Sequence, residues 1–242
     1  AVIPIDGIIS KRMNLFSQIS GGASTELIGR DIRAALADPD VHSLLLQVDS
    51  PGGTVDGTQV LAQAIHGARG KKPIVTYVDG MMASAAYWIG SAADAIYIGA
   101  DTVQVGSIGV VASHTDYSRR EEMLGVKTTE IFAGKFKRIA SSHKPLSEDG
   151  KGYIQEMVDY LYSVFVADIA KQRGVDAETV LKNMADGRIF TGQQAVSAGL
   201  VDGVATMDRL IADLNAGTIG QQGRKARLAA LNAALQSAPV RA

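Results

Sequence analysis

Ser84 lies where a predicted strand gives way to a predicted helix, a place where a serine hydroxyl can act on a substrate. Residues 73–78 have the pattern of a strand and residues 85–93 that of a helix. Open α/β sheets bind ligands at the carboxyl ends of their strands, and the amide of Ala85 could serve there as an oxyanion donor. The ordinary alternative is a serine that only caps the helix. Ser84 is therefore a candidate nucleophile that needs support from other residues.

A second strand end carries the run Asp-Ser-Pro-Gly-Gly-Thr at residues 49–54. Consecutive glycines let the backbone turn sharply and direct amide groups at a ligand, and the helix predicted at residues 55–68 adds positive potential at its start. An oxyanion hole would need such amides. A plain turn between strand and helix explains the same residues equally well.

A nucleophilic serine needs a base, and histidine is the first residue type to consider. His42, His66 and His143 have the setting of packing or surface residues. His114 with Asp116 could complete a Ser-His-Asp triad, but the surrounding residues give no further triad signal.

A lysine can also act as a base. Lys137 lies with Lys135 in a basic stretch at residues 133–138, for which a solvated charge cluster is the default interpretation. A free lysine has a pKa of about 10.4, so a lysine base requires a site that favours the neutral amine, chiefly by burial.

The composition excludes several other classes of function. The chain has 242 residues, 46% of them apolar, a formal net charge of -1 and no cysteine. Disulfides and thiolate metal sites are thereby excluded, and the absence of a long basic run argues against nucleic-acid binding. No apolar run reaches the roughly 18 residues of a membrane span, so we expect a soluble, cytoplasmic protein. The chain begins without Met and directly in a strand-like run, which suggests that a longer natural N-terminus was removed.

Strands and helices alternate along the chain, which predicts an α/β fold of repeated βαβ units around a largely parallel sheet. The expected strands are residues 2–9, 42–49, 73–78, 95–99 and 128–132. The expected helices are residues 26–37, 55–68, 85–93, 150–172 and 176–184, and a polar loop is expected at 134–149. In the long helix, apolar residues recur at steps of three or four from Tyr153 to Phe165, which indicates a stripe that packs in the core or at a subunit interface.

The periodic pattern ends near residue 214. We therefore expect one domain at residues 1–214, followed at 215–242 by a Gly/Gln linker and a tail rich in Ala and Leu. The tail is too short to fold alone and would dock on a partner helix or remain partly disordered.

Six ordered blocks resemble the signal peptide peptidase A family of serine proteases, which has the Clp protease/crotonase-like fold. The resemblance spans roughly residues 2 to 210. The blocks are residues 49–53, 83–87, 105–110, 134–137, 186–192 and 195–202.

The resemblance implies a Ser-Lys dyad that works through an acyl-enzyme, without metal or organic cofactor. Ser84 matches the family's nucleophile, Lys137 its general base and Ser107 a serine that hydrogen-bonds the lysine. The amides of Gly53 and Ala85 would form the oxyanion hole, and Lys135 does not align with the base. The family often has Gly-Gly after the nucleophile where this chain has two alanines, which keep the amides.

The resemblance also bears on partners. The single protease copy and the Ala/Leu tail favour the phage branch of the family, which processes capsid and scaffold proteins, over the branch that degrades signal peptides. The family forms rings or domes in which serine and lysine can come from neighbouring copies, so a homo-oligomer is expected. Two alternatives from other classes are a crotonase-type acyl-CoA enzyme, for which Glu121, Glu122 and Glu130 fit no catalytic pattern, and a non-catalytic assembly protein.

Overall fold

The computed structural model describes residues 1–13 and 21–219 of the chain. These residues form two compact units, which are described in turn. The first unit contains residues 1–109 and the described residues from 165 onward, and the second contains residues 110–164.

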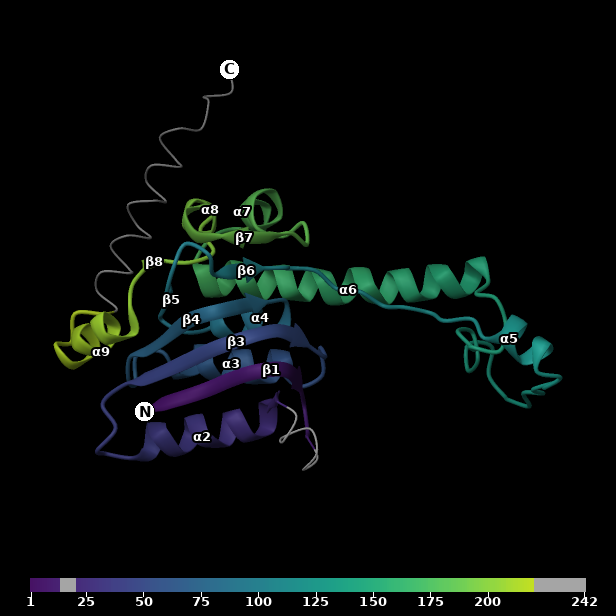
Figure 1. Cartoon of the computed structure of the whole chain (residues 1–242), viewed down its shortest axis with the longest axis horizontal. Coiled ribbons are helices and arrows are strands. Elements are labelled where there is room, and N and C mark those ends of the chain that lie inside the picture. The colour runs from purple at the N-terminus through teal and green to yellow at the C-terminus, as the bar shows by residue number, and fades with distance from the viewer. Residues whose placement is uncertain (14–20, 220–242) are drawn as a thin grey trace, which may run out of the picture. The chain divides into compact units, whose positions relative to one another are not determined.

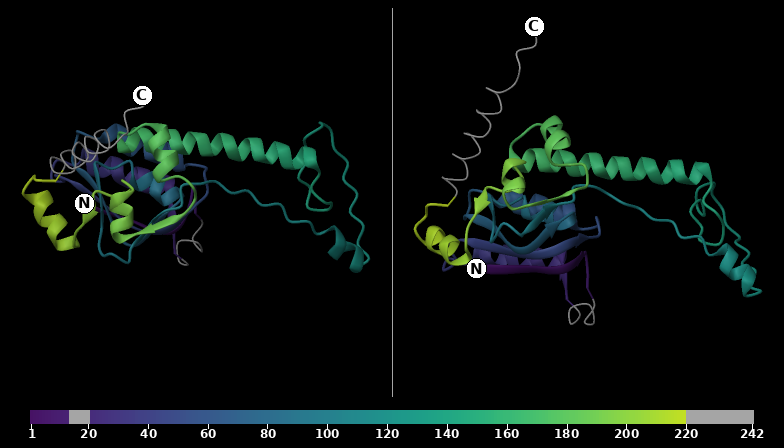
Figure 2. Two further views of the ribbon diagram at one scale, coloured as in Figure 1. Left: turned by 90° about the horizontal axis from the view of Figure 1, so that it is seen from above. Right: turned by 45° about the horizontal axis from the view of Figure 1, so that its top comes forward.

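An eight-stranded sheet forms the centre of the first unit. Its main path runs β2-β1-β3-β4-β5-β8, and β6 pairs with both β4 and β7. The strands are β1 (Val2–Ser10), β2 (Gly22–Ser24), β3 (Leu44–Gly53), β4 (Ile74–Ala83), β5 (Ala95–Ile98), β6 (Gln104–Gly106), β7 (Ile189–Thr191) and β8 (Gly203–Val204). All the pairings are parallel except that between β6 and β7. The purple-to-blue strands β1, β3 and β4 lie side by side in Figure 1 and in the right-hand view of Figure 2.

Helices connect the parallel strands, as the alternating pattern predicts. They are α2 (Thr25–Ala37), α3 (Thr58–Ala68) and α4 (Ala85–Gly90). After the second unit along the chain, α7 (Ala177–Asn183) precedes β7, α8 (Gly192–Ser197) joins β7 to β8, and α9 (Met207–Asn215) follows β8. Leu44, Leu45 and Leu46 at the start of β3 are all buried, since both faces of the sheet are covered there. The prediction of βαβ units around a largely parallel sheet is confirmed.

One face of the sheet is covered where β3 and β4 begin by a cluster that includes the end of the described chain. Leu45, Val75 and Tyr77 pack there with Leu210 of α9 and with Ile219. Packed structure thus continues past the domain boundary expected at residue 214. The division at that residue stays a prediction, and the Ala/Leu tail lies outside the described residues.

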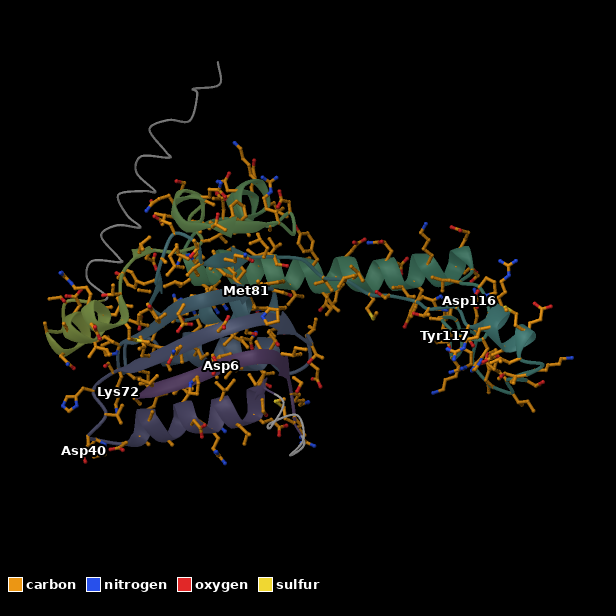
Figure 3. All side chains as sticks on the ribbon, viewed as in Figure 1. Asp6, Asp40, Lys72, Met81, Asp116 and Tyr117 are labelled. Atoms are coloured by element: carbon orange, nitrogen blue, oxygen red, sulfur yellow. The ribbon has the colours of Figure 1, made fainter. Side chains whose placement is uncertain are left out.

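The second unit contains α5 (Ser118–Met123) and residues 148–164 of the long helix α6 (Glu148–Arg173). Asp116 and Tyr117, which precede α5, are labelled in Figure 3. The strand expected at residues 128–132 is wrong: the segment has no regular secondary structure, and Ile131 is 96% exposed. Its β-branched residues have a strand's composition, but a strand needs a pairing partner, and none pairs with it in the described part of the chain.

The expected apolar stripe on α6 divides in two. Phe165 is 1% exposed and packs in the first unit, whereas Tyr153, Met157 and Tyr160 are exposed, with Tyr160 at 68%. The stripe is therefore core only at its C-terminal end. Its exposed part leaves the alternative of a subunit interface.

Candidate active site

Ser84 occupies a strained turn between β4 and α4. Its backbone has φ 52° and ψ -122°, and its side chain makes no capping hydrogen bond, although the residue stands at the N-cap position. A positive φ is uncommon for a residue other than glycine and costs about 1–3 kcal/mol, so the surrounding structure must hold it in place. The structure thus has the strand-turn-helix geometry in which a serine hydroxyl is presented rather than used as a cap.

Ser107 lies directly after the neighbouring strand. Ala83 and Gly106 are register partners in β4 and β6, and the Ser84 amide donates to the Gly106 carbonyl at 2.9 Å. Ser84 and Ser107 therefore follow paired positions on adjacent strands. Both have φ of 52°, and within residues 1–13 and 21–219 they are the two non-glycine residues with positive φ. The Ser107 amide donates to the Arg188 carbonyl at 2.8 Å. This hydrogen bond joins the block at residues 186–192 to the turn that carries Ser107.

The two glycines at the end of β3 lie against this turn. A Cβ atom at Gly52, which has φ 102°, would lie 2.8 Å from the Ser84 Cβ and 3.0 Å from the Ala85 nitrogen. At Gly53 a Cβ would overlap the Ile9 carbonyl oxygen of β1, at 1.9 Å. Side chains are excluded at both positions, so the bare backbone of β3 approaches the serine turn closely.

The directions of the Gly53 and Ala85 amides follow from β3 and α4, the elements in which these residues lie. Thr54 donates its amide to the Ile9 carbonyl at 2.9 Å. Because successive amides of a strand point to opposite edges, the Gly53 amide points away from β1, toward the edge on which β4 lies. The Ala85 amide belongs to the first turn of α4, whose N–H groups have no acceptor within the helix. Two amide donors therefore flank the Ser84 turn.

Buried contacts hold α4 in place. The Tyr87 hydroxyl donates to the Leu200 carbonyl at 2.8 Å, and the Trp88 indole nitrogen donates to Asp168 at 2.9 Å. The Trp88 and Phe165 rings are stacked with centroids 4.3 Å apart. These contacts tie the helix that begins at Ser84 to α6 and to the block at residues 195–202.

Asp6 on β1 and Asp49 on β3 are carboxylates in strands that lead toward the site; Asp6 is labelled in Figure 3. Asp49 accepts the Met81 amide at 2.9 Å, and a Cβ atom at Gly80 would lie 2.3 Å from an Asp49 oxygen. Burial, together with the nearby charges of Asp49 and Asp79, raises the pKa of Asp6. The described chain holds no group of three or more His, Cys, Asp or Glu side chains that could bind a metal ion.

Lys137 lies in the second unit, on the segment between α5 and α6. Its side chain is exposed, and its amide donates to the Gly134 carbonyl at 3.1 Å. Phe136 stacks on Tyr153 with ring centroids 5.3 Å apart, and the Lys135 amine lies 5.1 Å from the Phe136 ring centroid. The dry surroundings that a lysine base needs are not found around Lys137 within the second unit.

The loop that carries Lys137 is nevertheless held on both sides. Arg138 forms an ion pair with Glu130, whose pKa is lowered chiefly by the hydrogen bond from Arg138. Ser141 is buried, and its carbonyl oxygen lies 2.9 Å from Nε2 of His114. His114, the alternative base, is thus engaged with the backbone of this loop.

Sequence reasoning missed two features of the site. It selected Gly53 as the oxyanion donor but gave no role to Gly52, which approaches Ser84 most closely. It also placed Ser107 only by resemblance, whereas the register of β4 and β6 puts Ser107 beside Ser84. No local pattern predicts that register, because residues 88–104 separate the blocks at 83–87 and 105–110.

These features define an α/β protein of the Clp type with a serine presented at the end of a parallel strand. The same fold occurs in a ClpP1 mutant from Listeria monocytogenes, with a TM-score of 0.55 and 14% identity over 86% of this chain and 94% of that one. It also occurs in a mutant of the membrane-bound stomatin-specific protease 1510-N, with a TM-score of 0.56 and 17% identity over 87% and 82% of the two chains. At these identities the likeness shows the fold, and the expected Clp-like fold is confirmed.

The chain belongs to peptidase family S49, because residues 67–219 match the sequence model of that family. A protein of Methanocaldococcus jannaschii, provisionally named a protease, is 40% identical over 70% of this chain and 54% of its own length. Capsid assembly protease C of Escherichia phage lambda is 31% identical over 84% of this chain and 45% of its own. A protein of Enterococcus faecium, provisionally named signal peptide peptidase SppA, is 37% identical over 83% and 58%. The chain thus spans about half the length of these curated relatives. Within the described residues, no helix is both long and apolar enough to cross a membrane.

Proposed function

We propose that this chain is a serine endopeptidase in which Ser84 is the nucleophile and Lys137 the general base. The observation that carries the proposal is the backbone of Ser84, which is held at a positive φ with its hydroxyl free of any helix-capping bond. A serine that served only as a cap would have extended backbone angles and would accept an amide. Membership of peptidase family S49 supports the same chemistry.

The reaction would proceed through an acyl-enzyme. The Ser84 oxygen attacks the carbonyl carbon of the scissile peptide bond, and its proton passes to the neutral amine of Lys137. The oxygen of the tetrahedral intermediate takes the negative charge and is held by the amides of Gly53 and Ala85. Lys137 then gives the proton to the leaving amine as the C–N bond breaks. A water molecule then gives a proton to the Lys137 amine and attacks the acyl carbon. The bond to the Ser84 oxygen breaks, the proton on Lys137 returns to that oxygen, and the acid product is released.

Ser107 would orient the lysine. It follows the strand paired with that of Ser84, and its amide is fixed by the Arg188 carbonyl. With φ at 52° it also has a strained backbone. A hydroxyl at this position could accept a hydrogen bond from the lysine amine and hold it toward Ser84.

A homo-oligomer would give Lys137 the dry surroundings that it lacks in its own unit. The second unit exposes apolar side chains that a monomer rarely leaves in water, among them Val111, Ile131, Tyr153, Met157 and Tyr160. Burial against a neighbouring copy would favour the neutral amine. In this arrangement serine and lysine of one working site could come from different copies.

The proposed substrates are proteins processed during phage capsid assembly, which would place the activity in the bacterial cytoplasm. The 31% identity to the lambda protease over 84% of this chain supports this choice. Degradation of signal peptides is the second candidate, supported by the 37% identity to the Enterococcus faecium protein. Incubation with capsid and scaffold proteins in one arm and with signal peptides in another would distinguish the two.

The test of the dyad is covalent labelling combined with peptide hydrolysis. A fluorophosphonate probe should form a bond from the serine oxygen to phosphorus, with loss of fluoride, at Ser84 in the wild-type protein, and Ser84→Ala should abolish both labelling and hydrolysis. Lys137→Arg should also be inactive because a guanidinium stays protonated, whereas Lys135→Arg is the matched control and should keep activity. Undiminished hydrolysis by Ser84→Ala would reject the nucleophile, and an active Lys137→Arg protein would reject the base.

A further inference from the structure

Ser50 is a buried serine of β3 to which the mechanism above gives no role. Its side chain is 0% exposed. The hydroxyl donates to the Gly7 carbonyl at 2.6 Å and accepts the Gly52 amide at 3.1 Å. One side chain therefore joins β1 to the turn that approaches the nucleophile.

The two bonds of Ser50 lie where β3 loses its regular pairing. The register between β1 and β3 shifts between Asp6 and Ile8, which places Gly7, with φ 72°, at the irregularity. The register between β3 and β4 shifts between Val48 and Ser50. Bulges of this kind occur beside active sites, where they redirect the backbone. Pairing with β1 resumes at Gly52 and Gly53, opposite Ile8 and Ile9, so Ser50 bonds across the break between the two paired stretches of β3.

Gly52 links Ser50 to the turn that carries the nucleophile. It has φ 102°, and its backbone lies against Ser84 and Ala85, as the close approach of a Cβ atom to both residues shows. Glycine can adopt many backbone conformations, so a glycine pair does not by itself hold its amides in one direction. The rotation of the peptide group between Gly52 and Gly53 decides where the Gly53 amide points. The Gly52 amide that begins this segment is held by Ser50.

We propose that Ser50 is a positioning residue for the oxyanion hole. Its hydroxyl fixes the Gly52 amide and thereby the peptide group that directs the Gly53 amide at the developing oxyanion. This inference rests on the proposed function of Ser84, and it adds a residue that touches neither substrate nor nucleophile. A preorganised donor stabilises the transition state more than the bound substrate, so loss of Ser50 should affect kcat rather than KM.

The matched control is Ser24, a buried serine at 6% exposure on β2. Its hydroxyl also donates to a carbonyl, that of Lys11 at 3.0 Å, and also accepts an amide, that of Leu27 at 3.4 Å. Ser24→Ala therefore removes the same kinds of hydrogen bond from the same sheet without touching Gly52. Both alanine variants should lower Tm, so a loss of stability alone cannot distinguish them.

The experiment compares peptide hydrolysis and aldehyde binding in the full-length wild-type, Ser50→Ala and Ser24→Ala proteins. Removal of one oxyanion donor costs about 100- to 1,000-fold in kcat, so mispositioning of one should cost roughly 10- to 100-fold, with KM within about 3-fold of wild type. A peptide aldehyde, whose carbonyl carbon bonds to the Ser84 oxygen and whose oxygen then occupies the oxyanion hole, should bind Ser50→Ala more weakly by a similar factor. Ser24→Ala should keep wild-type kcat and aldehyde affinity.

Two results would overturn the inference. Wild-type kcat in Ser50→Ala would show that Gly52 needs no such bond, and an equal loss of kcat in Ser24→Ala would show a general loosening of the sheet. If Ser50→Ala does not fold, Ser50→Cys keeps the side-chain size with a weaker hydrogen-bonding atom and should lose at least about 3-fold in kcat; unchanged kcat there would count against the inference. Failure of the proposed function is distinguishable, because it would appear as activity in Ser84→Ala.

Discussion

Replacement of Asp202 by asparagine should destabilise the protein strongly, because Asp202 neutralises a buried arginine at the end of α6. The Arg173 and Asp202 side chains are 3% and 2% exposed, and Nη2 of the arginine lies 3.0 Å from Oδ1 of the aspartate. Nη1 of Arg173 also donates to Oδ2 of Asp202 at 3.1 Å, and Nε of Arg173 donates to the Gly199 carbonyl at 2.9 Å. Burial disfavours the charge of Arg173, but the Asp202 carboxylate and Tyr87 together outweigh burial and raise the pKa of Arg173.

The expected loss follows from what asparagine can provide. Asp202 also accepts the Ile96 amide at 2.8 Å, so its two oxygens face donors only. Asparagine offers one oxygen and places an NH2 group against the remaining donors, while the guanidinium stays charged. Breaking a buried pair in this way costs about 3–5 kcal/mol. For a chain of this size 1 kcal/mol corresponds to about 2–4 °C in Tm, so the decrease should be roughly 6–20 °C.

The assay is thermal and urea unfolding of Asp202→Asn beside a matched control on the surface. Asp213 pairs with Arg209 at 2.8 Å on α9, with side chains 22% and 68% exposed. Asp213→Asn makes the same chemical change and should cost under about 1 kcal/mol. If the two variants lose the same stability within about 1 kcal/mol, the reasoning from burial is refuted.

Two further predictions concern assembly and pH. If Ser84 and Lys137 of one site come from different copies, mixing inactive Ser84→Ala with inactive Lys137→Ala protein should restore part of the hydrolysis; mixed oligomers of tagged and untagged chains that stay inactive would place both residues in one chain. Burial, reinforced by Arg69 and Lys171, lowers the pKa of His66, whose Nδ1 is buried without a partner. The folded state therefore resists a proton that the unfolded state binds, so the free energy of unfolding should fall as pH drops below about 6.5. His66→Gln should flatten that dependence more than the same change at the exposed His42, and equal slopes in both variants would contradict the assignment.

The parallel sheet could be predicted because each of its long strands can be recognised from the residue pattern of its own segment. Residues 44–48 form an apolar run that needs cover on both faces, and the helices on either side show their own period. The segment at 128–132 also has residue types that favour a strand, but it has no partner strand in the described chain, so local propensity failed there. Propensity describes a residue's fit to a strand, whereas a strand exists only where another strand pairs with it.

The site could be predicted only in part, for a related reason. The types of Ser84, Gly53 and Ala85 and their places at strand ends can be read along the chain. The strain at Ser84 and Ser107 cannot, because a positive φ arises from contacts such as that of the Ser84 amide with Gly106, which come from other strands. Ser50 was likewise visible in the motif, but its bond to Gly7 depends on a register shift that no local pattern records.

The exposure of Lys137 has a consequence for how the proposed enzyme would be controlled. A lysine must be neutral to take the Ser84 proton, and burial favours the neutral amine, so the proposed mechanism needs more than a complete serine turn. Burial of that lysine by a neighbouring copy would create the base and the assembled state in one step. Activity would then depend on protein concentration, and an isolated chain would cleave little before assembly. Such a dependence would suit a protease that acts within an assembling particle, because hydrolysis would begin only where many copies gather.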